Sequence, residues 1–207
     1  MIVVARDKKI LLTSWGKGTG GADTVVRTNA AELRRRGIET DILDHHYNPP
    51  YILETSRGIK LHFQTVGELV KGVDWENVAA LHNSACTMSE AELDGIKRGN
   101  PYLPHLYTAH SLLVHEAINH PRHREFKSQF DAVPEREKRR LIAEMRKDSF
   151  VQSQDRTIAH ADVVHHMTIH GSGLFGFYYP EYADKSVVLP HGTDFAKYDT
   201  HENRQRA

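Results

Sequence analysis

Two histidines and a glycine-rich loop are the residues of this chain best suited to chemistry. His82 and His110 each follow a short apolar segment, and Gly20 and Gly21, preceded by Lys17, come just before a helical pattern. Backbone N–H groups at such a loop, together with the positive end of the helix dipole, can hold a phosphate or a sugar hydroxyl. The alternatives without a chemical role are that the glycines only permit a tight turn and that each histidine is a surface residue.

The glycine-rich loop lies inside a strand–loop–helix–strand pattern. Residues 10–12 are an apolar run, and apolar residues then recur at helical spacing at Val26, Ala30 and Leu33. Arg34, Arg35 and Arg36 lie in the last turn of the predicted helix, where positive charge interacts favourably with the helix dipole. Gly37 follows them and can adopt the left-handed conformation that commonly ends a helix. Residues 38–43 alternate as a second strand. Because Lys17 precedes the paired glycines, the loop matches neither GxGxxG nor GxxxxGK[ST], which disfavours an ordinary dinucleotide-binding fold.

The rest of the chain continues this alternation of strands and helices. Residues 45–56 contain Pro49 and Pro50 and are predicted to form a surface loop. Further strands are predicted at 58–63, 77–81, 103–109, 162–167 and 186–189. The expected fold class is therefore α/β, a Rossmann-like parallel sheet with helices on both faces. In such a sheet the strand ends at 81 and 109 bring His82 and His110 to the edge that carries the glycine-rich loop.

Helices are predicted from capping residues and periodicity. A short helix is expected at 66–70, and Ser89 with Glu92 forms a capping box that opens a helix ending at Gly99. A long helix is predicted from Pro134 towards Ala161, with core-facing residues at Leu141, Met145 and Phe150. Residues 171–182 are glycine-rich and aromatic and are expected to form a turn or helix.

Composition narrows the class of partner and the compartment. The 207 residues contain 27 Lys and Arg against 27 Asp and Glu, so there is no basic field to attract nucleic acid. The single cysteine, Cys86, fits a reducing compartment, and no segment has the roughly 18 apolar residues of a membrane helix. Fifteen histidines are present without HExxH or CxxC spacing, so no metal is expected. A cytoplasmic protein without a membrane span is predicted.

A basic segment at 120–124 is a second candidate for binding. It contains Arg122 and Arg124 together with His120 and His123, and it could hold a phosphorylated or acidic ligand. The alternative is a solvated loop.

Four motifs, taken together and in order, resemble a known enzyme family. They are the KGTGG loop, AAELRRRGIETDIL, TAHSL after a strand that ends in His82, and AHADVV followed by YADKSVVLPHGTDFAKY. In this order they look like the N-terminal half of a retaining glycosyltransferase of family 4, with the GT-B fold, and TAHSL resembles sucrose-phosphate synthases and sucrose synthases. The resemblance covers about residues 9–198.

The resemblance implies two facing Rossmann-like domains with the active site between them. Residues 1–198 would be the acceptor-binding domain and 199–207 a polar tail, while the donor-binding C-terminal domain is absent from this sequence. The implied reaction moves a glycosyl group from a nucleotide sugar, a substrate rather than a cofactor, to a sugar, a sugar phosphate or a similar hydroxyl. A separate C-terminal-domain subunit is then an expected partner.

Residue roles follow from the same resemblance. His110 would be catalytic, reaching the donor sugar and stabilising developing charge, and His82 would line the acceptor side. The other residues expected to bind substrate are Lys17, Gly20, Gly21 and Ser111, and the charge of the basic segment adds Arg122 and Arg124. Retention by front-face attack requires no glycosidase-like carboxylate pair. Two other classes stay open: a non-catalytic module that binds sugar phosphate or docks a partner, and a metal-dependent hydrolase in which scattered histidines converge.

Overall fold

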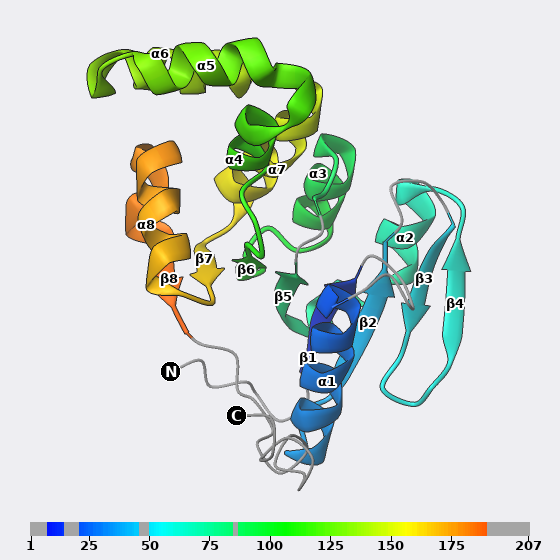
Figure 1. Ribbon diagram of the computed structural model, residues 1–207. Helices are drawn as coiled ribbons and strands as arrows, with labels where there is room; N and C mark the ends of the chain where they lie inside the picture. The colour runs from blue at the N-terminus through cyan, green and yellow to red at the C-terminus, as the bar shows by residue number, and fades with distance from the viewer. Residues whose placement is uncertain (1–7, 15–20, 46–49, 85–86, 190–207) are drawn as a thin grey trace, which may run out of the picture.

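The computed structural model describes residues 8–14, 21–45, 50–84 and 87–189. Its strands are β1 (Lys9–Ser14), β2 (Thr40–Asp44), β3 (Tyr51–Glu54), β4 (Lys60–Phe63), β5 (Val78–Ser84), β6 (His105–Thr108), β7 (Val163–His166) and β8 (Ser186–Val188). They form one eight-stranded sheet in the order β4-β3-β2-β1-β5-β6-β7-β8 (Figure 1). The strands from β2 to β8 in this order run parallel, and only β3 and β4 are antiparallel to their neighbours. The predicted Rossmann-like α/β fold is confirmed.

Helices cover both faces of the sheet. They are α1 (Gly21–Arg35), α2 (Val66–Gly72), α3 (Glu90–Gly99), α4 (Leu113–Asn119), α5 (Arg124–Ala132), α6 (Glu135–Met145), α7 (Ser149–His160) and α8 (Ile169–Tyr178), with short 3-10 turns at η1 (Trp75–Asn77), η2 (Pro121–His123) and η3 (Pro180–Lys185). Leu12 and Ile42 pack with α1, whereas Leu11 and Leu43 pack with α2 and α3. Successive strand side chains point to opposite faces, so these helices lie on opposite sides of the sheet. None of the described helices combines the length and the apolar character that crossing a membrane requires.

The predicted first unit, β1–α1–β2, is confirmed. Strands β1 and β2 pair in parallel from Ile10↔Thr40 to Ser14↔Asp44. The helix ends at a left-handed Gly37 (φ 78°), whose N–H donates to the carbonyl of Arg34, while the N–H of Ile38 donates to that of Leu33. These bonds satisfy carbonyl groups that the end of a helix would leave unpaired.

The predicted surface loop at 45–56 is wrong, because part of it is strand β3. Tyr51 and Leu53 are buried on one face of β3, and a turn at Thr55 to Gly58 brings the chain back as β4. Gly58 has φ 78°, which a glycine adopts without strain. A proline restricts only itself and the residue before it, so Pro50 can precede a strand without preventing it.

The predicted long helix at 134–161 is also wrong, because the chain breaks into α6 and α7. The side chain of Asp148 accepts a hydrogen bond from the N–H of Phe150, which starts a new helix there. Leu141 and Met145 are buried as predicted, but Phe150 is 44% exposed. The helical spacing of apolar residues thus indicates helix on both sides of residue 148, but it does not reveal that Asp148 caps a second helix.

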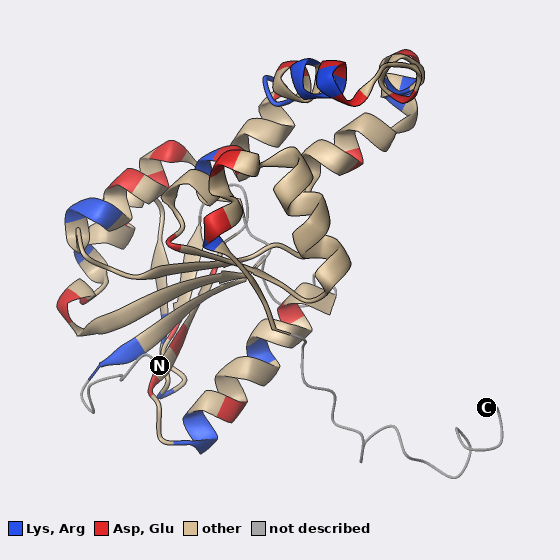
Figure 2. Ribbon diagram, turned by 90° about the vertical axis from the view of Figure 1, so that its left-hand side faces the viewer, with Lys and Arg blue, Asp and Glu red and all other residues tan. Residues whose placement is uncertain are grey.

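Helices α5 and α6 form an arm that stands away from the sheet (Figures 1 and 2). Lysine, arginine and acidic residues are spread along this arm (Figure 2). At its base Arg146 pairs with Asp155 at 2.7 Å, and the hydroxyl of Tyr179 donates to the same carboxylate at 2.7 Å. The guanidinium of Arg146 also lies 4.6 Å from the Tyr179 ring centre. These contacts fix the end of α6 to the core formed by α7 and α8.

Gly99→Ala tests the packing of α3 on η1. A Cβ at Gly99 would lie 2.5 Å from the indole of Trp75, which is buried. We expect a loss of roughly 1–3 kcal/mol in the free energy of unfolding, measured by chemical denaturation, since overpacking forces neighbours to move. The matched control is Gly173→Ala in α8, where a Cβ meets nothing within 4 Å. That change should stabilise by about 0.5–1 kcal/mol, and equal effects of the two substitutions would contradict the packing argument.

Candidate functional site

The carboxyl ends of β1, β5 and β6 form the candidate site. From β1 the chain crosses to β2 on one side, and the later strands β5 and β6 lie on the other side. The crevice beside such a reversal of strand order is where open α/β sheets bind ligands. Ser14, Ser84 and Thr108 are the last residues of these three strands. The sheet topology therefore brings polar side chains from distant parts of the sequence to one edge.

His110 lies at this edge, as the sequence predicted from the end of β6. Its Nε2 is 3.0 Å from the Oγ of Ser84, at the end of the neighbouring strand. The buried Ala109 that precedes it donates its N–H to the carbonyl of His165 at 3.0 Å. The backbone that carries His110 is thus held to β7 while its partly buried ring contacts β5.

His82 belongs to a chain of hydrogen bonds that crosses three strands. Its Nε2 is 2.8 Å from the Oγ1 of Thr108, which is 2.9 Å from the Nδ1 of His165. The Nε2 of His165 is 2.5 Å from the carbonyl oxygen of Leu189. Strand β5 runs on to Ser84, so His82 lies within the strand rather than after it, which corrects the predicted end at residue 81.

The carbonyl of Leu189 sets the direction of every proton in this chain. A carbonyl oxygen only accepts, so the Nε2 of His165 donates to it. In the neutral ring the Nδ1 of His165 is then an acceptor, and the hydroxyl of Thr108 donates to it. The Thr108 oxygen in turn accepts from the Nε2–H of His82, which leaves the Nδ1 of His82 as a hydrogen-bond acceptor.

A buried amide joins β1 to β5 beside these histidines. The hydroxyl of Thr13 donates to the Oδ1 of Asn83 at 2.9 Å, and both residues are fully buried. Among the described residues, the Nδ2 of Asn83 has no hydrogen-bond partner. The amide fixes the register of two neighbouring strands and places an N–H donor at the site.

An ion-pair cluster around Arg27 was missed by the sequence analysis. The guanidinium of Arg27 contacts Asp23 at 2.8 Å, Asp44 at 2.9 Å and Glu54 at 3.5 Å. Ser14 donates its hydroxyl to Asp23 at 2.8 Å. Burial lowers the pKa of Arg27, but the surrounding carboxylates outweigh it and raise the pKa overall. One cation therefore holds carboxylates from α1, β2 and β3, which positions the first turn of α1.

The pKa of Asp44 reports the same crowding. Burial raises it, Arg27 lowers it, and the neighbouring carboxylates of Asp23 and Glu54 raise it again. The net shift is upward, so a single guanidinium does not compensate fully for burial and repulsion. This part of the edge is acidic.

Glu92 connects the start of α3 to the end of β2. Its Oε2 accepts from the backbone N–H and the hydroxyl of Ser89, the predicted capping box, which is confirmed. Its Oε1 lies 2.6 Å from the Nε2 of His45, and both side chains are buried. Burial raises the pKa of Glu92, but the bonds from His45 and Ser89 outweigh it and lower the pKa to about 2. The carboxylate is therefore kept ionised in the core.

The remaining predicted site residues are placed in different ways. Lys17 and Gly20 lie outside the described residues, and Gly21 is the exposed first residue of α1. The backbone carbonyl of Ser111, next to His110, accepts from Gln154 at 2.9 Å. Arg122 and Arg124 line an open hollow of about 600 Å³ at the start of α5. Helix α4 separates that hollow from His110, so the arginines and the histidines form two groups.

The adjacent histidines His165 and His166 lie on opposite sides of β7. His165 contacts Thr108 on one side of β7, while the ring of His166 packs 4.9 Å from that of Phe175 in α8, so this adjacent pair diverges as predicted. Within the ranges that the structure describes, no three His, Cys, Asp or Glu side chains gather as metal ligands would.

Comparison with known proteins finds matches among solved structures, none among family models and no significant one among curated proteins. A solved structure of HepE from Anabaena, in complex with UDP and glucose, is similar in fold, with a TM-score of 0.44 and 15% sequence identity. The similarity covers 96% of this chain and 50% of that one. The chain therefore spans about half the length of this neighbour.

Glu92→Gln tests the buried contact with His45. Replacing the buried carboxylate with a neutral amide weakens its hydrogen bonds with His45 and Ser89 and should lower the free energy of unfolding at pH 7 by roughly 1.5–3 kcal/mol. The control is Glu90→Gln, an exposed acid in the same helical turn, which should change stability by less than about 0.5 kcal/mol.

Lowering the pH should remove the stability that the ionised Glu92 carboxylate contributes. Because folding lowers the pKa of Glu92 from 4.5 to about 2, its stabilisation is fully present above pH 4.5 and is lost as the pH falls towards 2. Urea denaturation over this range should therefore show a smaller loss of stability in Glu92→Gln than in the wild type. Parallel curves would contradict the assignment.

Thr108→Val tests the chain of hydrogen bonds across the strands. Valine keeps the shape but leaves the Nε2–H of His82 and the Nδ1 of His165 without the shared hydroxyl. We expect a destabilisation of about 1–3 kcal/mol in chemical denaturation. Thr108→Ser keeps the hydroxyl and should retain most of the stability, so equal losses in both variants would mean that the methyl group matters and the hydroxyl does not.

Proposed function

We propose that this chain is the acceptor-binding domain of a GT-B glycosyltransferase of the retaining family 4 type. In this proposal a glycosyl group moves from a nucleotide sugar to a hydroxyl of a sugar or sugar phosphate. The order of the sequence motifs supports the proposal, as does a fold in which α1, which follows the glycine-rich residues of the sequence, begins at the carboxyl edge of the sheet. The domain would span residues 1–198, and a partner subunit or further sequence would supply the donor-binding half.

The contact between Ser84 and His110 carries the proposal. It brings the ends of β5 and β6 together beside β1, at the reversal of strand order where a substrate would enter. The His110 ring is only partly buried, so it can contact a ligand, while Ser84 is buried and can fix the orientation of the ring. A held imidazole of this kind can stabilise charge that develops at a reacting sugar.

Other groups at this edge suit hydroxyl ligands. The Arg27 cluster places the carboxylates of Asp23 and Asp44 at the carboxyl edge of the sheet, beside the end of β1. Acceptors of this kind match the donor O–H groups of an acceptor sugar. In the proposal Lys17, Gly20 and Gly21 bind a phosphate group of the substrate. Arg122 and Arg124, which line the hollow at the start of α5, bind substrate as a second group.

Transfer assays with His110→Ala test the proposal. The purified chain is incubated with UDP-, GDP- and ADP-sugars and with sugar or sugar-phosphate acceptors, with and without a candidate donor-domain partner. Activity should appear with the partner and fall by roughly 10²-fold or more in His110→Ala. His62→Ala, which changes an exposed histidine of β4, should keep full activity.

Each other outcome has a meaning. Undiminished activity in His110→Ala would reject the catalytic role of that residue. Transfer by the chain alone would reject the need for a second domain. No turnover under any condition, together with saturable binding of a sugar phosphate in calorimetry, would replace the enzyme with a non-catalytic binding module.

A further inference from the structure

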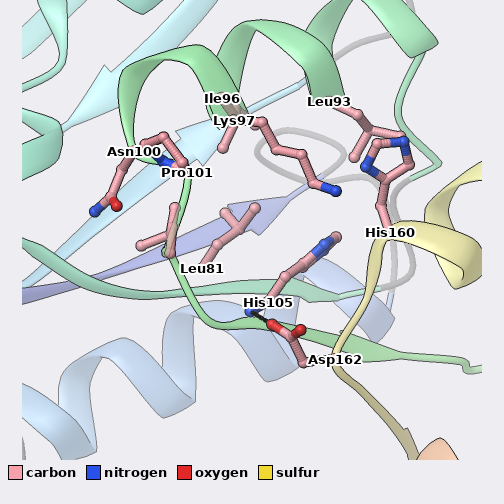
Figure 3. A pocket seen from close by; sticks show the side chains of 10 residues that line it. Leu81, Leu93, Ile96, Lys97, Asn100, Pro101, His105, His160 and Asp162 are labelled. Atoms are coloured by element: carbon pink, nitrogen blue, oxygen red, sulfur yellow. Dashed lines mark hydrogen bonds between the residues drawn. The ribbon is translucent and has the colours of Figure 1, made fainter.

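A small cavity lies on the opposite, amino edge of the sheet (Figure 3). It has a volume of about 110 Å³ and lies beneath the last turns of α3 and α7, beside the first residue of β6. Its polar lining residues are Lys97, Asn100, His105, His160 and Asp162, and its apolar wall includes Leu81 and Leu93. The Asn100 amide is already engaged, because it donates to the carbonyl of Trp75 and accepts from the N–H of Tyr102. Parallel strands carry their amino ends away from the candidate active site, so this cavity is separate from His82 and His110.

His105 presents an unsatisfied nitrogen to this cavity. The residue is 7% exposed, and its backbone N–H donates to the Oδ2 of Asp162 at 2.8 Å. The imidazole makes a hydrogen bond with the backbone of His160. Its Nε2 is buried and has no hydrogen-bond partner anywhere in the described ranges. A buried polar atom of this kind costs free energy unless a ligand or water satisfies it.

His160, on the opposite wall of the cavity, also has a buried ring nitrogen, Nδ1, without a hydrogen-bond partner among the residues described. The ammonium end of the Lys97 side chain extends towards both rings (Figure 3). Burial, aided by the charge of Lys97, lowers the pKa of His160, and burial is the main cause that lowers the pKa of His105 to about 4. At neutral pH both rings are therefore uncharged. Because the other ring nitrogen of His105 bonds the backbone of His160, its Nε2 is an acceptor, and Nδ1 of His160 is a second acceptor in the tautomer that holds the proton on Nε2.

This set of groups selects against ions. A cation would meet the ammonium of Lys97. An anion would meet the lone pairs of two neutral imidazoles and the carboxylate of Asp162, with Glu90 and Asp94 also near His160. A hydroxyl group suits both sides, because it donates to an imidazole nitrogen and accepts from an ammonium. The C–H groups of a polyol can then pack against Leu81 and Leu93.

We propose that this cavity binds a small neutral polyhydroxy compound, a polyol or one end of a sugar, at a site separate from the candidate active site. Its hydroxyls donate to Nε2 of His105 and Nδ1 of His160 and accept from Lys97. The volume is below the roughly 300–1,000 Å³ of pockets for drug-sized ligands, so a nucleotide does not fit.

Titration of the whole chain with glycerol, erythritol and glucose tests the proposal. Side-chain NMR signals of the histidine rings are followed at pH 7, and the signals of His105 and His160 should shift saturably with at least one of the three probes. Lys97→Met should weaken that binding about tenfold, by removal of one charged hydrogen bond. Lys71→Met, an exposed lysine of the neighbouring helix α2, is the matched control and should leave the affinity unchanged.

Three outcomes would overturn the proposal. The absence of saturable shifts with all three probes would mean that the cavity holds water only. Saturation by sodium phosphate or zinc chloride instead of a polyol would assign a different class of ligand. Equal binding by the wild type and Lys97→Met would exclude the proposed donor. Because Lys97 is exposed, its replacement should leave the fold intact, and circular dichroism checks this.

Discussion

The sheet depends on one constraint, that polar side chains buried between parallel strands must satisfy one another. Thr13 with Asn83 joins β1 to β5, and Thr108 joins β5 to β7 through two imidazoles. Thr13, Asn83 and Thr108 are fully buried, where water cannot replace their bonds, so a shift of one strand by one residue would leave several polar groups unpaired. The register of the central strands, and with it the position of His110 beside Ser84, follows from this constraint.

The same hydrogen bonds also fix which atoms at this edge of the sheet donate protons and which accept them. The backbone carbonyl of Leu189 accepts a hydrogen bond from Nε2 of His165, so the proton of that neutral ring lies on Nε2. The Thr108 hydroxyl then donates to His165 and accepts from Nε2 of His82. Three strands are therefore coupled by proton position as well as by packing. On the other side of β1, Arg27 gathers carboxylates from α1, β2 and β3. A ligand that enters between these two groups meets side chains already held in place.

Local signals in the sequence predicted much of this, and long-range contacts did not. The β1–α1–β2 unit, the capping box at Ser89 and the strand that delivers His110 could all be predicted from periodicity and short motifs. Strand β3 was missed because Pro50 was given too much weight, and the break before α7 depends on a single cap at Asp148. The Arg27 cluster and the bonds of Thr108 join residues far apart in sequence, and of these contacts only the Asp23–Arg27 pair has the i,i+4 spacing that a helix indicates. Lys17 and Gly20 lie outside the described residues, and their predicted roles stay predictions.

The strand order also has a consequence for how the chain folds. Strand β1 precedes the other described strands in the chain, yet it occupies the middle of the sheet, where it pairs with β2 on one side and with β5, from residue 78 onward, on the other. A nascent chain therefore keeps one edge of β1 without its native partner until β5 has left the ribosome. Such an open apolar edge is a site for chaperone binding or for aggregation. Biogenesis of this domain should thus be most vulnerable during the synthesis of β2 to β4, before its central pairing exists.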